Sequence, residues 1–356
     1  MILSGKAKDD CLRGMTRLVQ GDPAGALADL DSALGSAPDC PEAYNNRGTV
    51  RHALGDLAGA VTDFDRALEI APRYVEAYNN RGTVRHALGD YVGAVADFDQ
   101  ALEIDPRHPE AYNNRGAARQ ALGELEAALA DFDRALELRP RYAEAYNNRG
   151  SARHVLGNLA GAIADFDQAL QRWPSQSAAP VYENRAAARY ALGDYQGAVA
   201  DYDEALRLTP RPTAAPIYHS RGGARHAAGD FAGTIADYNS ALELDSGLCA
   251  AYISRGHARY HRRDSLATND YRMAFRLDAR LAASEIIRVL LQDLRRDAEA
   301  VLENCLKHIR INPADLVAYA RRGLTLLLQD RHDEAEQDFQ QVPSAWGPNG
   351  EVHFGS

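Results

Sequence analysis

The sequence has very few lysines and no long apolar run. Only three of its 40 basic residues are lysines, at Lys6, Lys8 and Lys307, and the rest are arginines. No apolar stretch approaches the ~18 residues that a transmembrane helix needs, and the first ten residues lack the apolar core of a signal peptide. The sequence therefore predicts a soluble, cytoplasmic protein with no membrane partner.

Cysteine is also scarce, and its spacing excludes two common uses of it. The four cysteines, Cys11, Cys40, Cys249 and Cys305, show no Cys-x-x-Cys pair. We therefore expect reduced, partly buried thiols and neither a disulfide framework nor a zinc site. Acidic residues outnumber basic ones by 50 to 40, a net charge of −10. A nucleic-acid-binding array is expected to carry a basic stripe along many repeats, so no nucleic-acid partner is predicted.

The dominant feature is an internal repeat of 34 residues. The segment Ala-Tyr-Asn-Asn-Arg-Gly begins at residues 43, 77, 111 and 145, and residues 44–56 and 78–90 are identical over thirteen positions. Weaker copies stay in frame around Tyr182, Tyr218, Tyr252 and Tyr319. A fixed period of this length indicates an array of one repeated supersecondary unit.

Local signals predict two helices in each repeat. The first covers residues 44–54 and ends at Gly55, a residue typical of helix C-termini. Asp56 can cap the second helix, which carries Ala60, Phe64 and Leu68 at helical spacing and stops before Pro72.

The glycine, alanine, phenylalanine and proline positions resemble those of the tetratricopeptide repeat, a 34-residue helix–turn–helix unit. That resemblance implies an all-α, right-handed superhelical solenoid of about ten units. Residues 1–7 form an N-terminal lead and residues 342–356 a C-terminal tail read as loop or disorder. The units are expected near residues 8–41, 42–75, 76–109, 110–143, 144–179, 180–215, 216–249, 250–283, 284–316 and 317–341.

Two junctions between repeats are longer than the others. Tyr182 follows Pro174, and Tyr218 follows Pro210, by eight residues, whereas Tyr78 follows Pro72 by six. The Ala-Pro pairs at residues 179–180 and 215–216 are therefore predicted to lengthen loops or to adjust the superhelix locally.

Arginine occupies two positions per repeat where the tetratricopeptide family usually has leucine and an aromatic. On a helical wheel Arg47 and Arg51 share an arc with Gly48, and a matching acidic series on the second helix includes Asp63 and Asp65. A partly buried arginine needs a partner, since an unpaired buried charge is strongly destabilising. We expect a ladder of Arg–Asp pairs between the two helices; binding of a phosphate or carboxylate ligand is the alternative.

The opposite arc of the first helix is polar and repeated almost verbatim. An asparagine amide offers both donors and an acceptor, so a row of them can hold a peptide by its backbone. The row resembles the asparagine ladder in the groove of O-GlcNAc transferase, which implies peptide binding at Asn45, Asn46, His52, Asn79, Asn80, His86, Asn113, Asn114, Asn147, Asn148, His154 and Asn184. The alternative interpretation is that these asparagines are solvated, or cap and bridge adjacent units.

The recurring histidines do not predict a metal site. Metal ligands must converge within a few ångströms, whereas equivalent residues of stacked helices lie roughly 10 Å apart. The sequence contains no nucleophile elbow, phosphate-binding glycine loop or zinc-protease motif. We therefore expect no cofactor, no metal and no enzymatic activity.

The expected function is a non-enzymatic protein-interaction scaffold that binds an extended peptide segment of a partner in its concave groove. Two alternatives remain: self-assembly into a homo-oligomer, and a regulatory or substrate-recruiting subunit of an enzyme complex. Residues 250–283 are unusual, because this unit contains seven arginines and only three aspartates. That unit is either a dock for an acidic partner or an altered turn near the end of the array.

Overall fold

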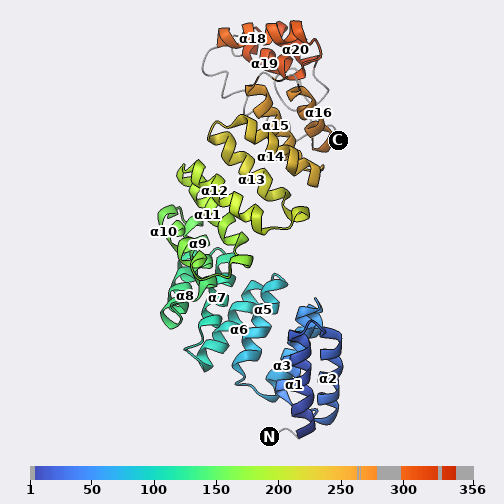
Figure 1. The fold of residues 1–356 in the computed structure, drawn as a ribbon, viewed down its shortest axis with the longest axis vertical. Helices are drawn as coiled ribbons and strands as arrows, with labels where there is room; N and C mark the ends of the chain where they lie inside the picture. The colour runs from blue at the N-terminus through green and yellow to red at the C-terminus, as the bar shows by residue number, and fades with distance from the viewer. Residues whose placement is uncertain (1–4, 263, 265, 279–297, 328–330, 342–356) are drawn as a thin grey trace. The chain divides into compact units, whose positions relative to one another are not determined.

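The computed structural model describes residues 5–262, 264, 266–278, 298–327 and 331–341. Within these ranges the chain forms nineteen α-helices and two short 3-10 helices, with no strand (Figure 1). The prediction of an all-α fold built from tandem helical hairpins is confirmed. None of the described helices combines the length and the apolarity needed to cross a membrane. The chain divides into two compact units, residues 1–188 and 189–356, with the boundary inside helix α11.

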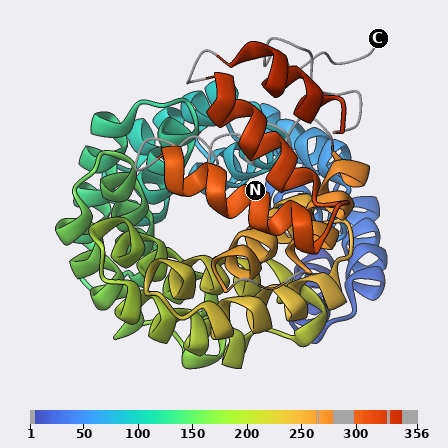
Figure 2. The same cartoon turned by 90° about the horizontal axis from the view of Figure 1, so that it is seen from above.

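Unit 1 is a series of antiparallel helix pairs that follow one another along a curve, from blue to green in Figure 2. Its helices are α1 (Gly5–Val19), α2 (Pro23–Ser36), α3 (Pro41–Ala53), α4 (Leu57–Ile70), α5 (Val75–Ala87), α6 (Tyr91–Ile104), α7 (Pro109–Ala121), α8 (Leu125–Leu138), α9 (Ala143–Val155), α10 (Leu159–Leu170), the 3-10 helix η1 (Ser175–Ser177) and most of α11 (Ala179–Leu192).

Unit 2 continues the same pattern of hairpins. It contains the end of α11, then α12 (Tyr195–Leu208), the 3-10 helix η2 (Arg211–Thr213), α13 (Ala215–Ala227), α14 (Phe231–Leu244), α15 (Cys249–His261), α16 (Ala267–Leu277), α18 (Ala298–Ile311), α19 (Leu316–Leu327) and α20 (His332–Phe339). The first part of the expected ninth repeat, residues 284–297, and the tail, residues 342–356, lie outside the described residues.

The hairpin of α3 and α4 closes through the turn that the sequence predicts, and a glycine with positive φ recurs at this position in six other hairpins, at Gly21, Gly89, Gly123, Gly157, Gly193 and Gly229. Gly55 adopts a φ of 80°, the left-handed conformation that ends α3. The next residue, Asp56, caps α4 by accepting a hydrogen bond from the Gly59 amide at 2.9 Å. The two helices then pack closely because Gly48 faces Phe64; a Cβ on Gly48 would lie 2.8 Å from the phenylalanine ring. The predicted roles of Gly55 and Asp56 are confirmed.

The core is distributed along the array as small clusters at the junctions between hairpins. Ala60 and Phe64 of α4 pack against Val84 of the following hairpin, and equivalent clusters recur in later hairpins. The first helices of successive hairpins also contact one another: α3 contacts α5, α5 contacts α7, and α7 contacts α9. Each hairpin therefore depends on its nearest neighbours, as in other repeat arrays.

The two long junctions lengthen the connection between hairpins, as predicted, from residues 71–74 between α4 and α5 to residues 171–178 and 209–214, but the place of the Ala-Pro pairs differs from the prediction. The inserted residues form η1 and η2, and each Ala-Pro pair begins the next helix, α11 or α13, instead of lying in a loop. The physical reason is that proline has a fixed φ and no N–H, which suits the first turn of a helix.

Candidate functional site

Buried aspartates on the second helices bind the arginines of the first helices. Arg47 donates from Nε and Nη2 to Asp63 at 3.0 and 2.6 Å, and Arg51 lies 2.9 Å from the same carboxylate. Asp63 is only 1% exposed. These hydrogen bonds raise the pKa of Arg47 above its usual range, so the guanidinium stays charged. The predicted Arg–Asp ladder is confirmed here and at Asp97, Asp131, Asp165, Asp237 and Asp270.

The same arginines tie each hairpin to the preceding one. Arg81 donates from Nη1 to Asp65 at 2.5 Å, across the junction between α4 and α5. Equivalent bonds join Arg47 to Asp31, Arg115 to Asp99, and Arg149 to Asp133. The sequence placed both acidic positions on the second helix but did not separate their roles, one within the hairpin and one across the junction.

The arginine row is therefore engaged inside the array. The Arg47 guanidinium also lies over the Tyr44 ring, 5.5 Å from its centroid, and this stacking recurs along both units. Its side chain is only 18% exposed. Positions such as Arg47 serve the packing of the hairpins, which leaves the asparagine row as the candidate contact surface.

The asparagines form a hydrogen-bonded chain from hairpin to hairpin. In each link the asparagine directly before the arginine of one first helix donates from Nδ2 to Oδ1 of the first asparagine on the preceding first helix. The links run from Asn80 to Asn45 at 3.0 Å, Asn114 to Asn79 at 3.1 Å, Asn148 to Asn113 at 3.0 Å and Asn184 to Asn147 at 3.0 Å. The alternative weighed from the sequence, that asparagines bridge adjacent units, describes these contacts.

In two of the four asparagine pairs, the first asparagine is buried and the second is not. Asn45 is 7% exposed and Asn113 is 1% exposed, because the neighbouring first helix covers them. Asn79 and Asn147, at the same position, are half-buried, as are Asn46, Asn80, Asn114, Asn148 and Asn184. The helical wheel placed Asn45 and Asn113 on an open polar face, and their burial is a difference that a single helix cannot reveal.

The donating asparagines keep part of their hydrogen-bonding capacity. An amide nitrogen carries two hydrogens and an amide oxygen accepts twice. Asn148 uses one hydrogen on Asn113 and accepts one long contact, at 3.5 Å, from Asn147. Asn46, the first of the row, makes no side-chain hydrogen bond within the described part of the chain, since Cys11 stands where an asparagine acceptor would be. At least one donor and one acceptor thus remain at each position of the row.

The histidines of the predicted site lie near the ends of the same helices. His52, His86 and His154 are half-buried, and His86 contacts the Tyr91 ring edge-on, with centroids 5.1 Å apart. In unit 2 the equivalent His226 packs against Phe231 and His261. Burial, with a smaller effect of His261, lowers the pKa of His226. Among the described residues, no three histidine, cysteine, aspartate or glutamate side chains lie close enough together to bind a metal ion.

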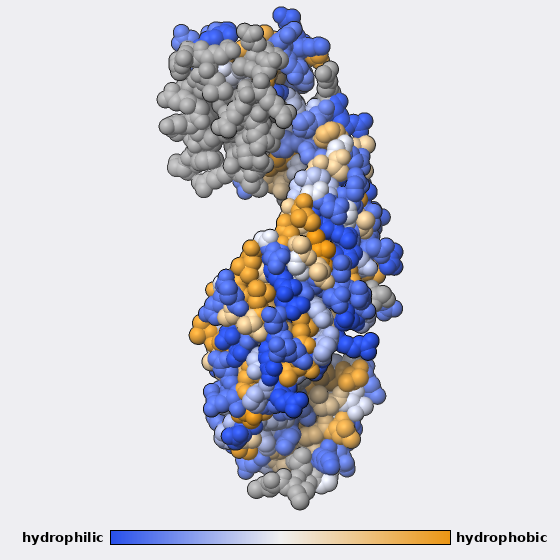
Figure 3. Space-filling view, turned by 90° about the vertical axis from the view of Figure 1, so that its left-hand side faces the viewer, coloured by the Kyte–Doolittle hydropathy of each residue, from blue (hydrophilic) through white to orange (hydrophobic). Residues whose placement is uncertain are grey.

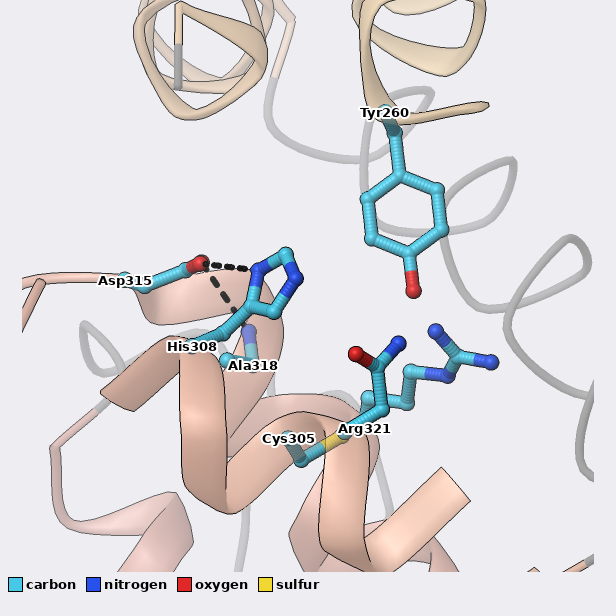
Figure 4. A pocket seen from close by; sticks show the side chains of 7 residues that line it. Tyr260, Cys305, His308, Asp315, Ala318 and Arg321 are labelled. Atoms are coloured by element: carbon cyan, nitrogen blue, oxygen red, sulfur yellow. Dashed lines mark hydrogen bonds and ion pairs between the residues drawn. The ribbon is translucent and has the colours of Figure 1, made fainter. Parts of the chain in front are cut away.

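Unit 2 contains a small pocket that the sequence did not predict. It is lined by Tyr260, Asn304, Cys305, His308, Asp315, Ala318 and Arg321. Figure 4 shows Tyr260 extending from α15 toward Arg321, whose guanidinium lies 5.3 Å from the centroid of the tyrosine ring. His308 Nδ1 lies 3.6 Å from Asp315, which also accepts from the Ala318 amide at 3.0 Å. The sequence signals here are single residues without a repeat, so no pattern pointed to them.

The four cysteines are free thiols, as the sequence predicts: Cys11, Cys40 and Cys305 are buried and Cys249 is half-buried. Burial raises the pKa of the Cys11 thiol to about 11.

The surface shown in Figure 3 is mainly hydrophilic, and hydrophobic residues form separate patches on it. Exposed leucines at one repeat position, Leu54, Leu88, Leu122 and Leu156, are between 38% and 54% exposed.

Four models of the tetratricopeptide repeat match the chain, at residues 11–75, 82–123, 109–142 and 141–209. No curated protein matches it. Solved structures do. A tetratricopeptide repeat protein from Parabacteroides merdae is 21% identical with a TM-score of 0.54, over 72% of this chain and 99% of that one.

Two further solved structures share the fold at low identity. PilW, a type IV pilus biogenesis factor, is 24% identical with a TM-score of 0.53, over 56% of this chain and 92% of its own. The Cut9–Hcn1 hetero-tetramer of the APC/C matches with a TM-score of 0.57 and 16% identity, over 78% of this chain and 54% of that one. The repeat models together cover more than half of the sequence, and the helical hairpins with their Gly–Phe contacts have the expected arrangement, so this chain belongs to the tetratricopeptide repeat family.

Proposed function

We propose that the chain is a non-enzymatic protein-interaction scaffold, and that the asparagine row of unit 1 binds an extended peptide segment of a partner by its backbone. The observation that carries this proposal is the chain of asparagine links. Each link fixes the orientation of one amide and leaves it a donor and an acceptor.

The links favour binding because they preorganise the amides. A free asparagine side chain must be ordered when a peptide arrives, and immobilising such a side chain costs roughly 0.5–1.5 kcal/mol. Asn80, Asn114 and Asn148 are already held at 3.0–3.1 Å from their partners. A peptide bond offers one donor and one acceptor, which matches what each amide has left.

The contact set is narrower than the one expected from sequence. Asn45 and Asn113 are buried and act as acceptors inside the array. The proposed peptide contacts are Asn46, Asn80, Asn114, Asn148 and Asn184, with Asn79, Asn147 and the histidines His52, His86 and His154 at the margins.

A matched pair of substitutions tests this proposal. Asn148→Ala and Asn113→Ala delete the same 3.0 Å link between hairpins, but only Asn148→Ala removes an accessible amide. The probe is an array of immobilised random peptides of about 15 residues, incubated with the full chain. Circular dichroism checks that both variants keep their helicity.

Peptides captured by the unsubstituted chain should bind Asn148→Ala and the triple variant Asn80→Ala/Asn114→Ala/Asn148→Ala at least about tenfold more weakly. Asn113→Ala should weaken binding less, because it keeps the Asn148 amide and loses only the bond that orders it. Equal losses in Asn113→Ala and Asn148→Ala would show that the asparagines serve packing alone. A mass that rises with concentration in light scattering, combined with no peptide capture, would assign the surface to self-assembly instead.

A further inference from the structure

We infer that the peptide held by the asparagine row adopts a polyproline II conformation. Every third residue of the peptide then presents the same backbone group to the next hairpin. This inference rests on the proposed function and specifies the partner's chemistry: a proline-rich segment with a three-residue period.

The first step is the spacing of the amides. The half-buried asparagine at the second position of the pair occurs once per hairpin, on α3, α5, α7, α9 and α11, and successive helices of this series are in contact through their asparagines. Packed helices lie about 8–10 Å apart. A bound chain must therefore present an equivalent backbone group at about that interval.

The second step compares this interval with the periods of extended chains. Polyproline II has three residues per turn and rises about 3.1 Å per residue, so equivalent groups recur about every 9.3 Å. In a β-strand they recur every two residues, at about 6.8 Å, and fall out of step with the hairpins. Polyproline II also makes no internal hydrogen bonds, which leaves its carbonyl and N–H groups available to the amides.

The third step is access to the backbone. One helical turn beyond each accessible asparagine, on the same face, the side chain is small: Thr49, Thr83, Ala117, Ser151 and Ala187. The hydroxyls of Thr49, Thr83 and Ser151 bond to the backbone carbonyl four residues earlier, at 2.9–3.0 Å. These hydroxyls are thus occupied within the helix, and their small side chains let a peptide backbone approach the amides.

The fourth step concerns charge. Each arginine of the unit 1 repeat positions on α3, α5, α7 and α9 is bound to an aspartate: Arg47, Arg51, Arg81, Arg85, Arg115, Arg119, Arg149 and Arg153. The row itself consists of uncharged amides, hydroxyls and methyl groups. An uncharged proline-rich segment fits such a surface better than an acidic peptide, which would need a cation.

The test uses three synthetic peptides of about 15 residues with a fluorescent label, and the full chain. The first repeats Pro-Pro-Gln, so that every third residue supplies an N–H. The second has the same composition with the glutamines gathered at one end. The third repeats Gly-Ser-Gln and is flexible. Affinity is measured by fluorescence anisotropy for the unsubstituted chain, Asn113→Ala and Asn148→Ala.

The Pro-Pro-Gln peptide should bind at least about tenfold more tightly than either of the others, because its conformation is preformed and its period matches the hairpins. Asn148→Ala should remove this preference and Asn113→Ala should keep it. If the flexible peptide binds equally well and still depends on Asn148, the polyproline II assignment is wrong while the peptide-binding function stands. If no peptide depends on Asn148, both are wrong.

Discussion

Asp97 holds two arginines at once. Arg81 donates to its two carboxylate oxygens at 3.0 and 2.5 Å, and Arg85 donates to one of them at 2.9 Å. Asp97 itself is 2% exposed. This cluster, repeated in most hairpins, replaces the apolar contact between helices that leucine and an aromatic would make.

Loss of Asp97 should therefore be severe. Asp97→Ala leaves two half-buried guanidinium groups without their main partner, so we expect a loss of about 3–5 kcal/mol in the free energy of unfolding. Asp65→Ala, which removes a 46% exposed partner of the same Arg81, should cost less than about 1 kcal/mol. Urea unfolding followed by circular dichroism measures both. Equal losses would show that burial does not govern these pairs.

Gly82 should not tolerate a methyl group. A Cβ at this position would lie 2.8 Å from Cε1 of Phe98, so Gly82→Ala forces the ring or the helices apart. We expect a destabilisation of about 1–3 kcal/mol. Gly35→Ala is the control, because nothing lies within 4 Å of its added Cβ and alanine favours the helix. Thermal unfolding should move in opposite directions for the two variants; a stabilised Gly82→Ala would contradict the close contact.

The second-helix caps should differ from hairpin to hairpin. The Asp90 side chain accepts from the Gly93 amide at 2.9 Å, whereas Glu124, at the same position in the next hairpin, makes no capping bond. Asp90→Ala should cost about 1 kcal/mol. Glu124→Ala should cost only a few tenths of that, from its weak surface pairing with Arg119 at 3.9 Å. Chemical denaturation of the two variants compares them directly, and a larger loss at Glu124 would overturn this ranking.

Unit 2 should lose stability in mild acid through His226. Burial and the neighbouring His261 lower the pKa of His226 in the folded chain. A proton then binds His226 more strongly in the unfolded chain than in the folded one. The free energy of unfolding is therefore highest above the pKa of the unfolded histidine, about 6.5, and falls as the pH drops below that value. His226→Gln should lose less stability than the unsubstituted chain between pH 7.5 and pH 5.5, measured by urea unfolding. The same loss in both proteins would remove His226 as the cause.

Most of the hairpin architecture could be predicted from sequence because its signals are local. Gly55 and Asp56 define a turn whatever lies around them, and Gly48 with Phe64 defines a close helix contact. The Arg47–Asp63 pairing could also be predicted, since both residues face the partner helix of the same hairpin. These interactions need no knowledge of the next repeat.

The contacts between repeats were harder to predict. Asp63 and Asp65 lie two residues apart on one helix, and only the packing of the next hairpin shows that Asp65 binds Arg81. In the same way, Asn45 and Asn46 appear equivalent in sequence, but the neighbouring helix buries one and leaves the other accessible. A helical wheel describes one helix, whereas these differences arise between helices.

Each asparagine link joins one repeat to the next, and this has a consequence for how the gene can change. Each repeat contributes one acceptor to the hairpin after it and one donor to the hairpin before it, and the Arg81–Asp65 contact follows the same rule. Removal of one whole repeat, residues 76–109, would bring Asn114 opposite Asn45 and Arg115 opposite Asp65. Duplication of that repeat would likewise leave every junction with its partners. Recombination between the near-identical copies can thus lengthen or shorten the array by whole repeats without creating an unmatched interface, and the length of partner that it accommodates would change in equal steps.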